Sequence, residues 1–254
     1  MQGQSECLSE SLAVAGAYEY KWLTDTLQPL QNPVGEDVLY DKGKGWPFMQ
    51  ESSPERWLSA HVMGSACYGH TNLIPSFCRA YLADVKTQVV AVPVAKGSTE
   101  IKDWLPGTPG YRAIVQKSLA AIRQAEAQGK VGRIFFVWLQ GESDAIFSRS
   151  KVDYKQKLIS LGTALVQDVH TDAFGIIRVG RFTGDQRDDE IIEAQREVCT
   201  EHPHFLMLSE LAEVLEKDPA YMNPNVAGHF GAKGLEALGA DAGARLGAYR
   251  IAKI

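Results

Sequence analysis

Three widely separated segments of this chain carry the groups that a serine-dependent hydrolytic site requires. Gly3-Gln4-Ser5-Glu6 lies near the amino terminus, Trp138 to Asp144 lies in mid-chain, and His229 precedes Phe230 near the end. A serine hydroxyl is a weak nucleophile at neutral pH, so it needs a base within hydrogen-bond reach and donors aimed at the oxyanion that forms during attack. The three segments therefore predict ester cleavage with Ser5 as the nucleophile.

Strand-like and helix-like segments alternate along most of the chain. Short apolar runs predict buried strands at 88–93, 134–138, 175–180 and 205–208. Helical periodicity between them places these residues on two helix faces: Ile114, Val115, Leu119 and Ile122, and then Leu158, Leu161, Leu165 and Val166. Further helices are expected at 190–199 and 232–249. The alternation predicts parallel βαβ units.

The predicted fold class is α/β, a single three-layer α/β/α sandwich that spans residues 1–254 around a central parallel sheet. No Pro-rich, Ser-rich or Gly-rich linker divides the chain. Residues 8–55 carry mixed signals and are expected to form long loops and short helices, with a strand at Val38-Leu39-Tyr40. No internal repeat is visible.

Candidate functional groups follow two of the predicted strands directly. Residues 96–99 follow the first strand, and Gln140-Gly141-Glu142 follow the second. In an open parallel sheet, functional groups collect beyond the carboxyl ends of the strands. We therefore expect these two segments to lie at one edge of the sheet.

Composition and charge disfavour two classes of partner. The chain has 45% hydrophobic and 22% charged residues and a net charge of -5. Nucleic acid and anionic membrane surfaces both favour clustered Lys and Arg, which this sequence lacks. It also lacks an apolar run of the roughly 20 residues that a transmembrane helix needs, and its first residues lack a signal-peptide pattern.

The cysteines and histidines do not form a recognisable metal motif. The four cysteines have no C-x-x-C spacing, which favours buried thiols, although an even number also permits two disulfides; they are Cys7, Cys67, Cys78 and Cys199. His202 and His204 lie two residues apart, but no third ligand is evident. No metal or organic cofactor is expected.

In the order of its motifs, the chain resembles the SGNH-hydrolase superfamily, within it the sialate O-acetylesterase and carbohydrate esterase family 6 group. The matching segments are Gly3 to Glu6, Lys96 to Trp104, Trp138 to Asp144, Glu193 to Arg196 and His229 to Gly231. The Trp-x-Gln-Gly-Glu-x-Asp segment is the most specific. The resemblance implies a flavodoxin-like SGNH fold and removal of O-acetyl groups from a sialic acid, xylan or another glycan.

The resemblance also implies roles for individual residues. Ser5 would be the nucleophile and His229 the general base. The backbone N–H groups of Ser5 and Gly97 and the side-chain amide of Gln140 would form the oxyanion hole. Trp46 and Trp104 are candidates to stack on a sugar ring, with a core position as the alternative for each, whereas Trp138 is expected in the core.

Three features depart from the family pattern. Val226 stands three residues before His229, where many relatives have an Asp. Either a backbone carbonyl or a neutral side chain fixes the imidazole, or another carboxylate reaches it, with Glu142 ahead of Asp218 and Asp144. Glu142 and Asp144 could instead hold loops.

The other two departures lie at the amino terminus. Glu6 replaces an Asn and is expected to face solvent or a basic residue. Only Met1 and Gln2 precede Gly3, so the chain could be part of a longer protein or an oligomeric assembly, or another segment could supply the first strand.

Three functions remain open at this point. The favoured function is a carbohydrate O-acetylesterase. The second is a lipase-like or thioesterase-like hydrolase of another acyl group. The third is a non-catalytic glycan-binding domain, which the absent Asp at Val226 and the presence of Glu6 favour.

Overall fold

The computed structural model describes residues 12–22, 24–32, 34–35, 62–63, 66–67, 71–95, 99–224 and 226–252. The strands are β1 (Ala17–Lys21), β2 (Thr26–Pro29), β3 (Val62–Met63), β4 (Ala66–Cys67), β5 (Val89–Ala91), β6 (Phe135–Trp138), β7 (Ala173–Ile177) and β8 (Phe205–Ser209). The α-helices are α2 (Ile74–Asp84), α3 (Pro109–Gln128), α4 (Glu142–Ile146), α5 (Lys151–Asp168), α6 (Gln186–Glu201), α7 (Ala212–Leu215) and α8 (Ala232–Ala252). Two short 3-10 helices are η1 (Ile101–Trp104) and η2 (Pro219–Tyr221).

The described strands form two three-stranded sheets and a two-stranded ribbon of β3 and β4. In one sheet β6, β7 and β8 lie side by side and all run parallel. In the other, β1 pairs in parallel with β5 and antiparallel with β2. The α/β class and the parallel strands predicted from the sequence are confirmed.

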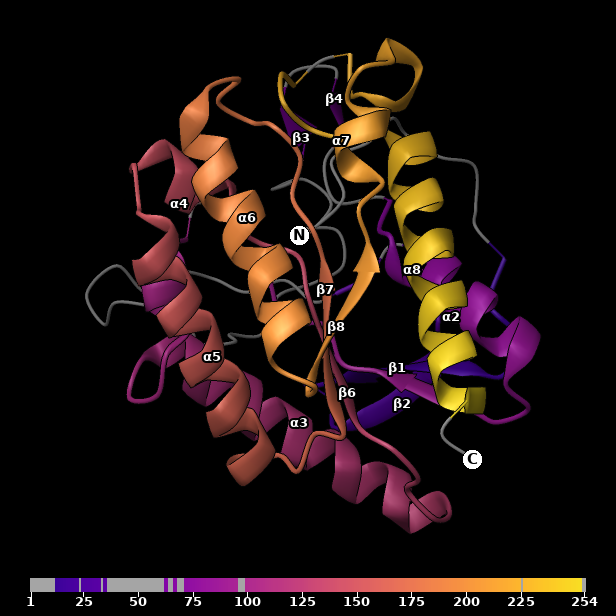
Figure 1. The fold of residues 1–254 in the computed structure, drawn as a ribbon. Helices are drawn as coiled ribbons and strands as arrows, with labels where there is room; N and C mark the ends of the chain where they lie inside the picture. Colours follow the sequence, from indigo (N-terminus) through magenta and orange to yellow (C-terminus); the bar gives the residue numbers. More distant parts are fainter. Residues whose placement is uncertain are drawn as a thin grey trace.

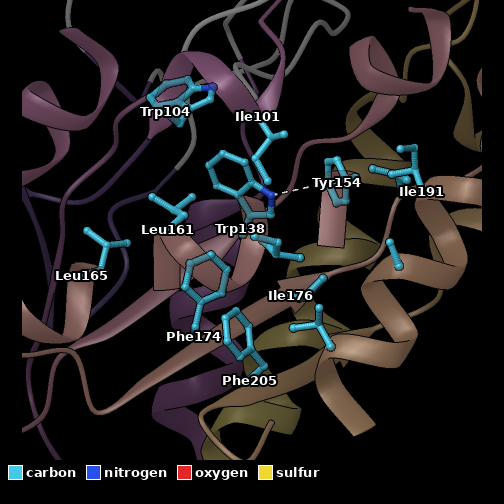
Figure 2. Packing of buried hydrophobic residues seen from close by; sticks show 14 of the residues in the cluster. Ile101, Trp104, Trp138, Tyr154, Leu161, Leu165, Phe174, Ile176, Ile191 and Phe205 are labelled. Carbon is cyan, nitrogen blue, oxygen red and sulfur yellow. Dashed lines mark hydrogen bonds between the residues drawn. The ribbon is translucent and has the colours of Figure 1, made fainter. Parts of the chain in front are cut away.

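Helices cover both faces of the parallel strands, as Figure 1 shows. Alternate side chains of β6 point to opposite faces, as they must in any strand. Phe136 and Trp138 pack with α3, α5 and α6, whereas Phe135 and Val137 pack with α2 and α8. Figure 2 shows the first of these two cores, in which Trp138, Phe174 and Phe205 lie close together. The result is a three-layer arrangement of helices, strands and helices.

Three of the longer helices, α3, α5 and α6, begin at a capping side chain. Thr108 accepts a hydrogen bond from the N–H of Tyr111 at the start of α3, where Pro109 also fixes the first turn. Ser150 caps α5 and Asp185 caps α6 in the same way. One assignment was wrong: Val166 is 38% exposed, whereas Leu158, Leu161 and Leu165 on the same helix are fully buried.

The prediction of loops and short helices for residues 8–55 was wrong for β1 and β2. The sequence of β1 hides its strand character because it carries charged residues at Glu19 and Lys21. In the fold Glu19 is only 1% exposed, with its carboxylate 2.8 Å from the Lys21 ammonium and accepting a hydrogen bond from the N–H of Gly35. The expected strand at 38–40 lies outside the described residues.

The backbone of helix α8 lies directly against the backbone of α2 at two glycines. A Cβ atom added at Gly239 would lie 2.2 Å from the carbonyl oxygen of Leu73, and one at Gly243 would lie 2.1 Å from that of Phe77. Only glycine fits at such distances, so these two residues allow the backbones of the two helices to approach. Because α8 starts directly after Gly231, this contact also fixes the segment that carries His229.

Candidate active site

Candidate groups gather at the carboxyl ends of the parallel strands. Gln140 and α4 follow β6, the segment from Arg178 to Asp185 follows β7, and α7 follows β8. In Figure 1, α4 and α7 lie at the end of the molecule toward which the arrow of β8 points. This is the edge where ligands bind in open α/β sheets.

Gln140 is held by its side chain as well as by its backbone. Its amide Nε2 donates to the carbonyl oxygen of Thr99 at 2.9 Å and to Oδ2 of Asp144 at 2.6 Å. These bonds join the end of β6 to the segment after β5, as predicted for the two strand ends. Both hydrogens of the amide are engaged, so as an oxyanion donor Gln140 would have to exchange one of these bonds for the substrate.

Asp144 is a buried carboxylate, 1% exposed. Its Oδ2 atom accepts hydrogen bonds from Gln140 and from the backbone N–H of Ile101. Burial raises the pKa of this carboxyl from 3.8 to about 6, and the two hydrogen bonds act in the opposite direction. Asp144 therefore fastens η1 to α4, one of the two roles that the sequence left open for it.

Glu142, the first candidate for a triad acid, begins α4 and is partly buried. Burial raises the pKa of its carboxyl, while backbone N–H groups and the charge of His229 lower it. The influence of His229 on this pKa is smaller than that of burial. No hydrogen bond joins Glu142 to His229 among the described residues.

The imidazole of His229 is oriented by a backbone carbonyl. Its Nδ1 atom lies 2.8 Å from the carbonyl oxygen of Ala227. A carbonyl can only accept, so Nδ1 carries a proton in this arrangement, and in the neutral imidazole Nε2 then keeps its lone pair. The N–H of Asn223 donates to the carbonyl of His229, and Met222 forms a β-bridge with Phe230, which closes the loop that holds the histidine.

Phe182 braces this loop from the segment after β7. The rings of Phe182 and His229 meet edge to face, with centroids 5.9 Å apart. Phe182 also lies against Gly228, whose φ is +73° and where an added Cβ would lie 2.5 Å from the ring. The buried carboxylate of Asp188 holds the Phe182 segment by accepting from the N–H groups of Thr183 and Gly184.

Several residues that the sequence singled out do not form part of the site that the structure describes. Ser5, Glu6, Gly97 and Trp46 lie outside the described residues. Trp104 was a candidate to bind sugar, but it is a core residue, 4% exposed, with its indole N–H donating to Thr99 and its ring edge-to-face with Trp138. Trp138 is 5% exposed, and its prediction as a core residue is confirmed.

The remaining candidates for a charged partner of His229 have other contacts. Asp218 accepts from the N–H of Ala220 at the start of η2. Val226 contributes only its carbonyl, which accepts from the N–H of His229 at 3.3 Å. The acceptor found for Nδ1, the carbonyl of Ala227, is one of the options that the sequence left open.

The paired histidines and the cysteines form no metal site in the described part of the chain. The rings of His202 and His204 both pack edge-to-face on Phe205, and no group of metal-binding side chains occurs within the described ranges. Cys78 and Cys199 are free thiols, as favoured from their spacing, while Cys7 lies outside the described residues. None of the helices described is both long and apolar enough to cross a bilayer.

The sequence missed three residues around the site, namely Ala227, Phe182 and Tyr154, whose hydroxyl donates to the carbonyl oxygen of Gln140 at 2.8 Å. A backbone carbonyl leaves no signal in the residue type, so Ala227 could not have been found. Gln195 was within reach, because it lies in the Glu193-Ala194-Gln195-Arg196 segment that matched the family.

The comparisons with known proteins agree with the geometry. A family model described as "Carbohydrate esterase, sialic acid-specific acetylesterase" matches residues 48–244. The chain is 24% identical over 204 residues to "Probable carbohydrate esterase At4g34215" of Arabidopsis thaliana, covering 77% of this chain and 72% of that protein.

Two solved structures share the fold. The X-ray structure of the Arabidopsis thaliana protein AT4G34215 gives a TM-score of 0.60 at 17% identity, over 94% of this chain and 83% of that one. The crystal structure of NanS gives a TM-score of 0.59 at 14% identity, over 98% of this chain and 96% of that one. Both likenesses support the α/β fold with a parallel sheet flanked by helices.

Proposed function

Because this chain belongs to the carbohydrate esterases of the sialic acid-specific acetylesterase family and is thus a hydrolase of ester bonds, we propose that it removes O-acetyl groups from a carbohydrate through an acetyl-Ser5 intermediate. The observation that carries the proposal is the hydrogen bond between Nδ1 of His229 and the carbonyl of Ala227. This bond leaves Nε2 free to accept a proton, which is what a general base requires. No metal or organic cofactor takes part.

The reaction proceeds in two halves. In the first, Nε2 of His229 takes the proton from the Ser5 hydroxyl while Oγ attacks the acetyl carbonyl carbon. The tetrahedral intermediate then breaks its bond to the sugar oxygen, which receives the proton from His229. In the second half, His229 takes a proton from water, the resulting hydroxide attacks acetyl-Ser5, and acetate leaves as the proton returns to Ser5.

Three donors stabilise the negative charge that develops on the acetyl carbonyl oxygen, and one acceptor stabilises the positive charge on His229. The backbone N–H groups of Ser5 and Gly97 donate to the oxyanion, and the Gln140 amide joins them by releasing its bond to the Thr99 carbonyl. The Ala227 carbonyl stabilises the imidazolium that forms in each half of the reaction. It does so less strongly than a carboxylate, because it carries only a partial charge.

The test is acetate release from a panel of acetylated glycans that includes O-acetylated sialic acids and acetylated xylan. Ser5→Ala and His229→Ala are each expected to lower kcat at least ~10³-fold while leaving the unfolding transition in place. Turnover by Ser5→Ala at the rate of the unmodified protein would refute the mechanism.

Two further measurements separate the alternative functions. A series of esters of increasing acyl length distinguishes an acetylesterase, which should reject groups beyond propionyl, from a lipase-like or thioesterase-like enzyme. Labelling of Ser5 by a fluorophosphonate is expected of an active nucleophile. A Ser5 that stays unlabelled while the protein binds glycans would instead favour the non-catalytic binding domain.

A further inference from the structure

A buried polar network surrounds Gln140, chiefly at its backbone carbonyl, and the Tyr154 hydroxyl in it also lies 3.3 Å from the side-chain Oε1 of Gln140. The carbonyl oxygen of Gln140 accepts two hydrogen bonds, from Nε2 of Gln195 at 2.9 Å and from the hydroxyl of Tyr154 at 2.8 Å. Gln195 lies on α6 and Tyr154 on α5, so two successive helices that follow β6 in the chain both fix the peptide at its end. This is the strand end that carries the proposed oxyanion donor.

Gln195 makes three side-chain hydrogen bonds inside the protein, where it is fully buried. Its Nε2 donates to the Gln140 carbonyl and to the Tyr154 hydroxyl, the latter at 3.1 Å. Its Oε1 accepts from the backbone N–H of Val179 at 3.1 Å. The side chain therefore links the segment after β6 to the segment after β7.

Tyr154 is equally buried and its hydroxyl is equally committed. It donates to the Gln140 carbonyl and accepts from Gln195 and from the indole N–H of Trp138 at 3.2 Å, the bond that Figure 2 shows as a dashed line. Loss of the hydroxyl would leave two buried donors each short of an acceptor. Such unsatisfied groups are costly, so the network favours one arrangement of the Gln140 peptide.

Helix α6 packs closely against the peptide that joins Gln140 to Gly141. The φ of Gly141 is +151°, and a Cβ added there would lie 2.7 Å from Cγ2 of Ile191 and 3.4 Å from Nε2 of Gln195. The backbone after Gln140 thus packs directly against the side chains of Ile191 and Gln195 on α6.

We propose that Gln195 and Tyr154 are positioning residues that hold Gln140, through its backbone carbonyl, where its amide can serve the oxyanion. This inference rests on the proposed function, in which the amide of Gln140 donates to the oxyanion. Catalytic donors must be placed to within about 1 Å, and a misplacement of that size can cost about 10²-fold in rate.

Three variants test the proposal. Tyr154→Phe removes one hydroxyl, Gln195→Met removes the amide at nearly constant length, and Tyr111→Phe is the matched control. The Tyr111 hydroxyl is also on a buried side chain and donates to Asp168 at 2.7 Å. Asp168 lies at the other end of α5, about 20 Å from Tyr154 at 1.5 Å per residue.

For acetate release, Tyr154→Phe and Gln195→Met are each expected to lower kcat by about 10-fold to 100-fold with KM changed less than about 3-fold. Tyr111→Phe is expected to change kcat by less than about 3-fold, although it also loses a buried hydrogen bond. Equal effects of Tyr154→Phe and Tyr111→Phe in an active enzyme would overturn the positioning role and leave the proposed function intact. If Gln195→Met does not fold, Tyr154→Phe decides the outcome.

Hydrogen exchange provides a readout that does not depend on activity. Peptides covering residues 139–146 and the amide of Val179 are expected to exchange faster in Gln195→Met than in Tyr111→Phe. Unchanged exchange in these segments would refute the inference. Absence of acetate release by the unmodified protein on every acetylated glycan would count against the proposed function, and exchange would then still decide whether the network holds Gln140.

Discussion

In the loop before α8, Nδ1 of His229 lies 2.8 Å from the carbonyl oxygen of Ala227. A carbonyl thereby occupies the place that a carboxylate takes in a Ser-His-Asp triad. It fixes the same tautomer of the imidazole but carries only a partial negative charge. The histidine is consequently oriented by the fold of its own loop, and changes in that loop should reach the chemistry directly.

Glu142→Gln should have a modest effect on turnover, because the carboxylate of Glu142 is near His229 but does not hold its Nδ1 atom. We expect kcat to fall by less than about 30-fold, compared with about 10⁴-fold when the orienting carboxylate of a triad is removed. Steady-state kinetics on an acetyl ester measure the difference, with Glu193→Gln on the exposed face of α6 as the control. A loss of 10³-fold or more would identify Glu142 as the orienting acid.

Gly228→Ala should disturb the histidine loop more than its backbone angle alone explains. The new Cβ would meet the Phe182 ring at 2.5 Å, in addition to the strain of a positive φ. Gly184→Ala is the matched control, because Gly184 has a φ of +75° and nothing within 4 Å of its added Cβ. We expect about 1–2 kcal/mol of destabilisation for Gly184→Ala and more for Gly228→Ala, together with at least a 10-fold lower kcat for Gly228→Ala.

Denaturant unfolding and acetate release measure these two effects. Adding Phe182→Ala to Gly228→Ala should restore part of the lost stability, because the clash is then removed. Equal loss of stability in the two glycine variants would show that Phe182 does not brace the loop.

Ionisation of Asp144 should lower the free energy of unfolding as the pH rises from about 4 to 6. Its carboxyl has a pKa of about 6 when folded and an ordinary value of 3.8, so the folded state binds more protons than the unfolded state between these values. The free energy of unfolding therefore falls across this window, by about 3 kcal/mol at most, and the loss is complete above it. Asp144→Asn keeps an acceptor for Ile101 and Gln140 but cannot ionise.

Unfolding measured by denaturant at several pH values checks this linkage. The stability of Asp144→Asn minus that of the unmodified protein should increase from pH 4 to pH 6 and then level off. A difference that stays constant across this window would mean that Asp144 does not titrate there.

Cys78 should resist alkylation in the folded protein. It is 2% exposed, and burial raises the pKa of its thiol to about 12, so only about 10⁻⁴ of it is thiolate at pH 8. Peptide mapping after treatment with iodoacetamide should find Cys78 unmodified in native protein and modified in protein unfolded by urea. Equal modification in both samples would contradict the buried position.

The parallel strands and main helices could be predicted because their signals are local. The apolar runs ending at Trp138 and in β8 are long enough to identify as strands, and α5 and α6 have helical periodicity and capping residues. β1 could not be identified in this way, since its buried Glu19 is neutralised by Lys21 only once the chain is folded. Burial of a charge depends on a partner that the local pattern does not reveal.

The candidate site was predictable to the extent that it depends on side-chain type. The sequence identified His229, Gln140 and Glu142, which the structure places at one edge of the sheet. It did not identify the carbonyl of Ala227, since every residue has a carbonyl and only the loop geometry selects this one. For Trp104 the sequence left a sugar-stacking position and a core position equally open, and only packing in the fold selects the core position.

Gly239 and Gly243 link the position of the histidine loop to the contact between α8 and α2. Since their backbone contacts with α2 leave no space for even a methyl group, a larger residue at either position would have to lift the whole of α8. The histidine would then move with the helix, away from the groups that follow β6 and β7. Substitutions at these two contacts between helices would therefore disturb the histidine loop while leaving every proposed catalytic residue unchanged.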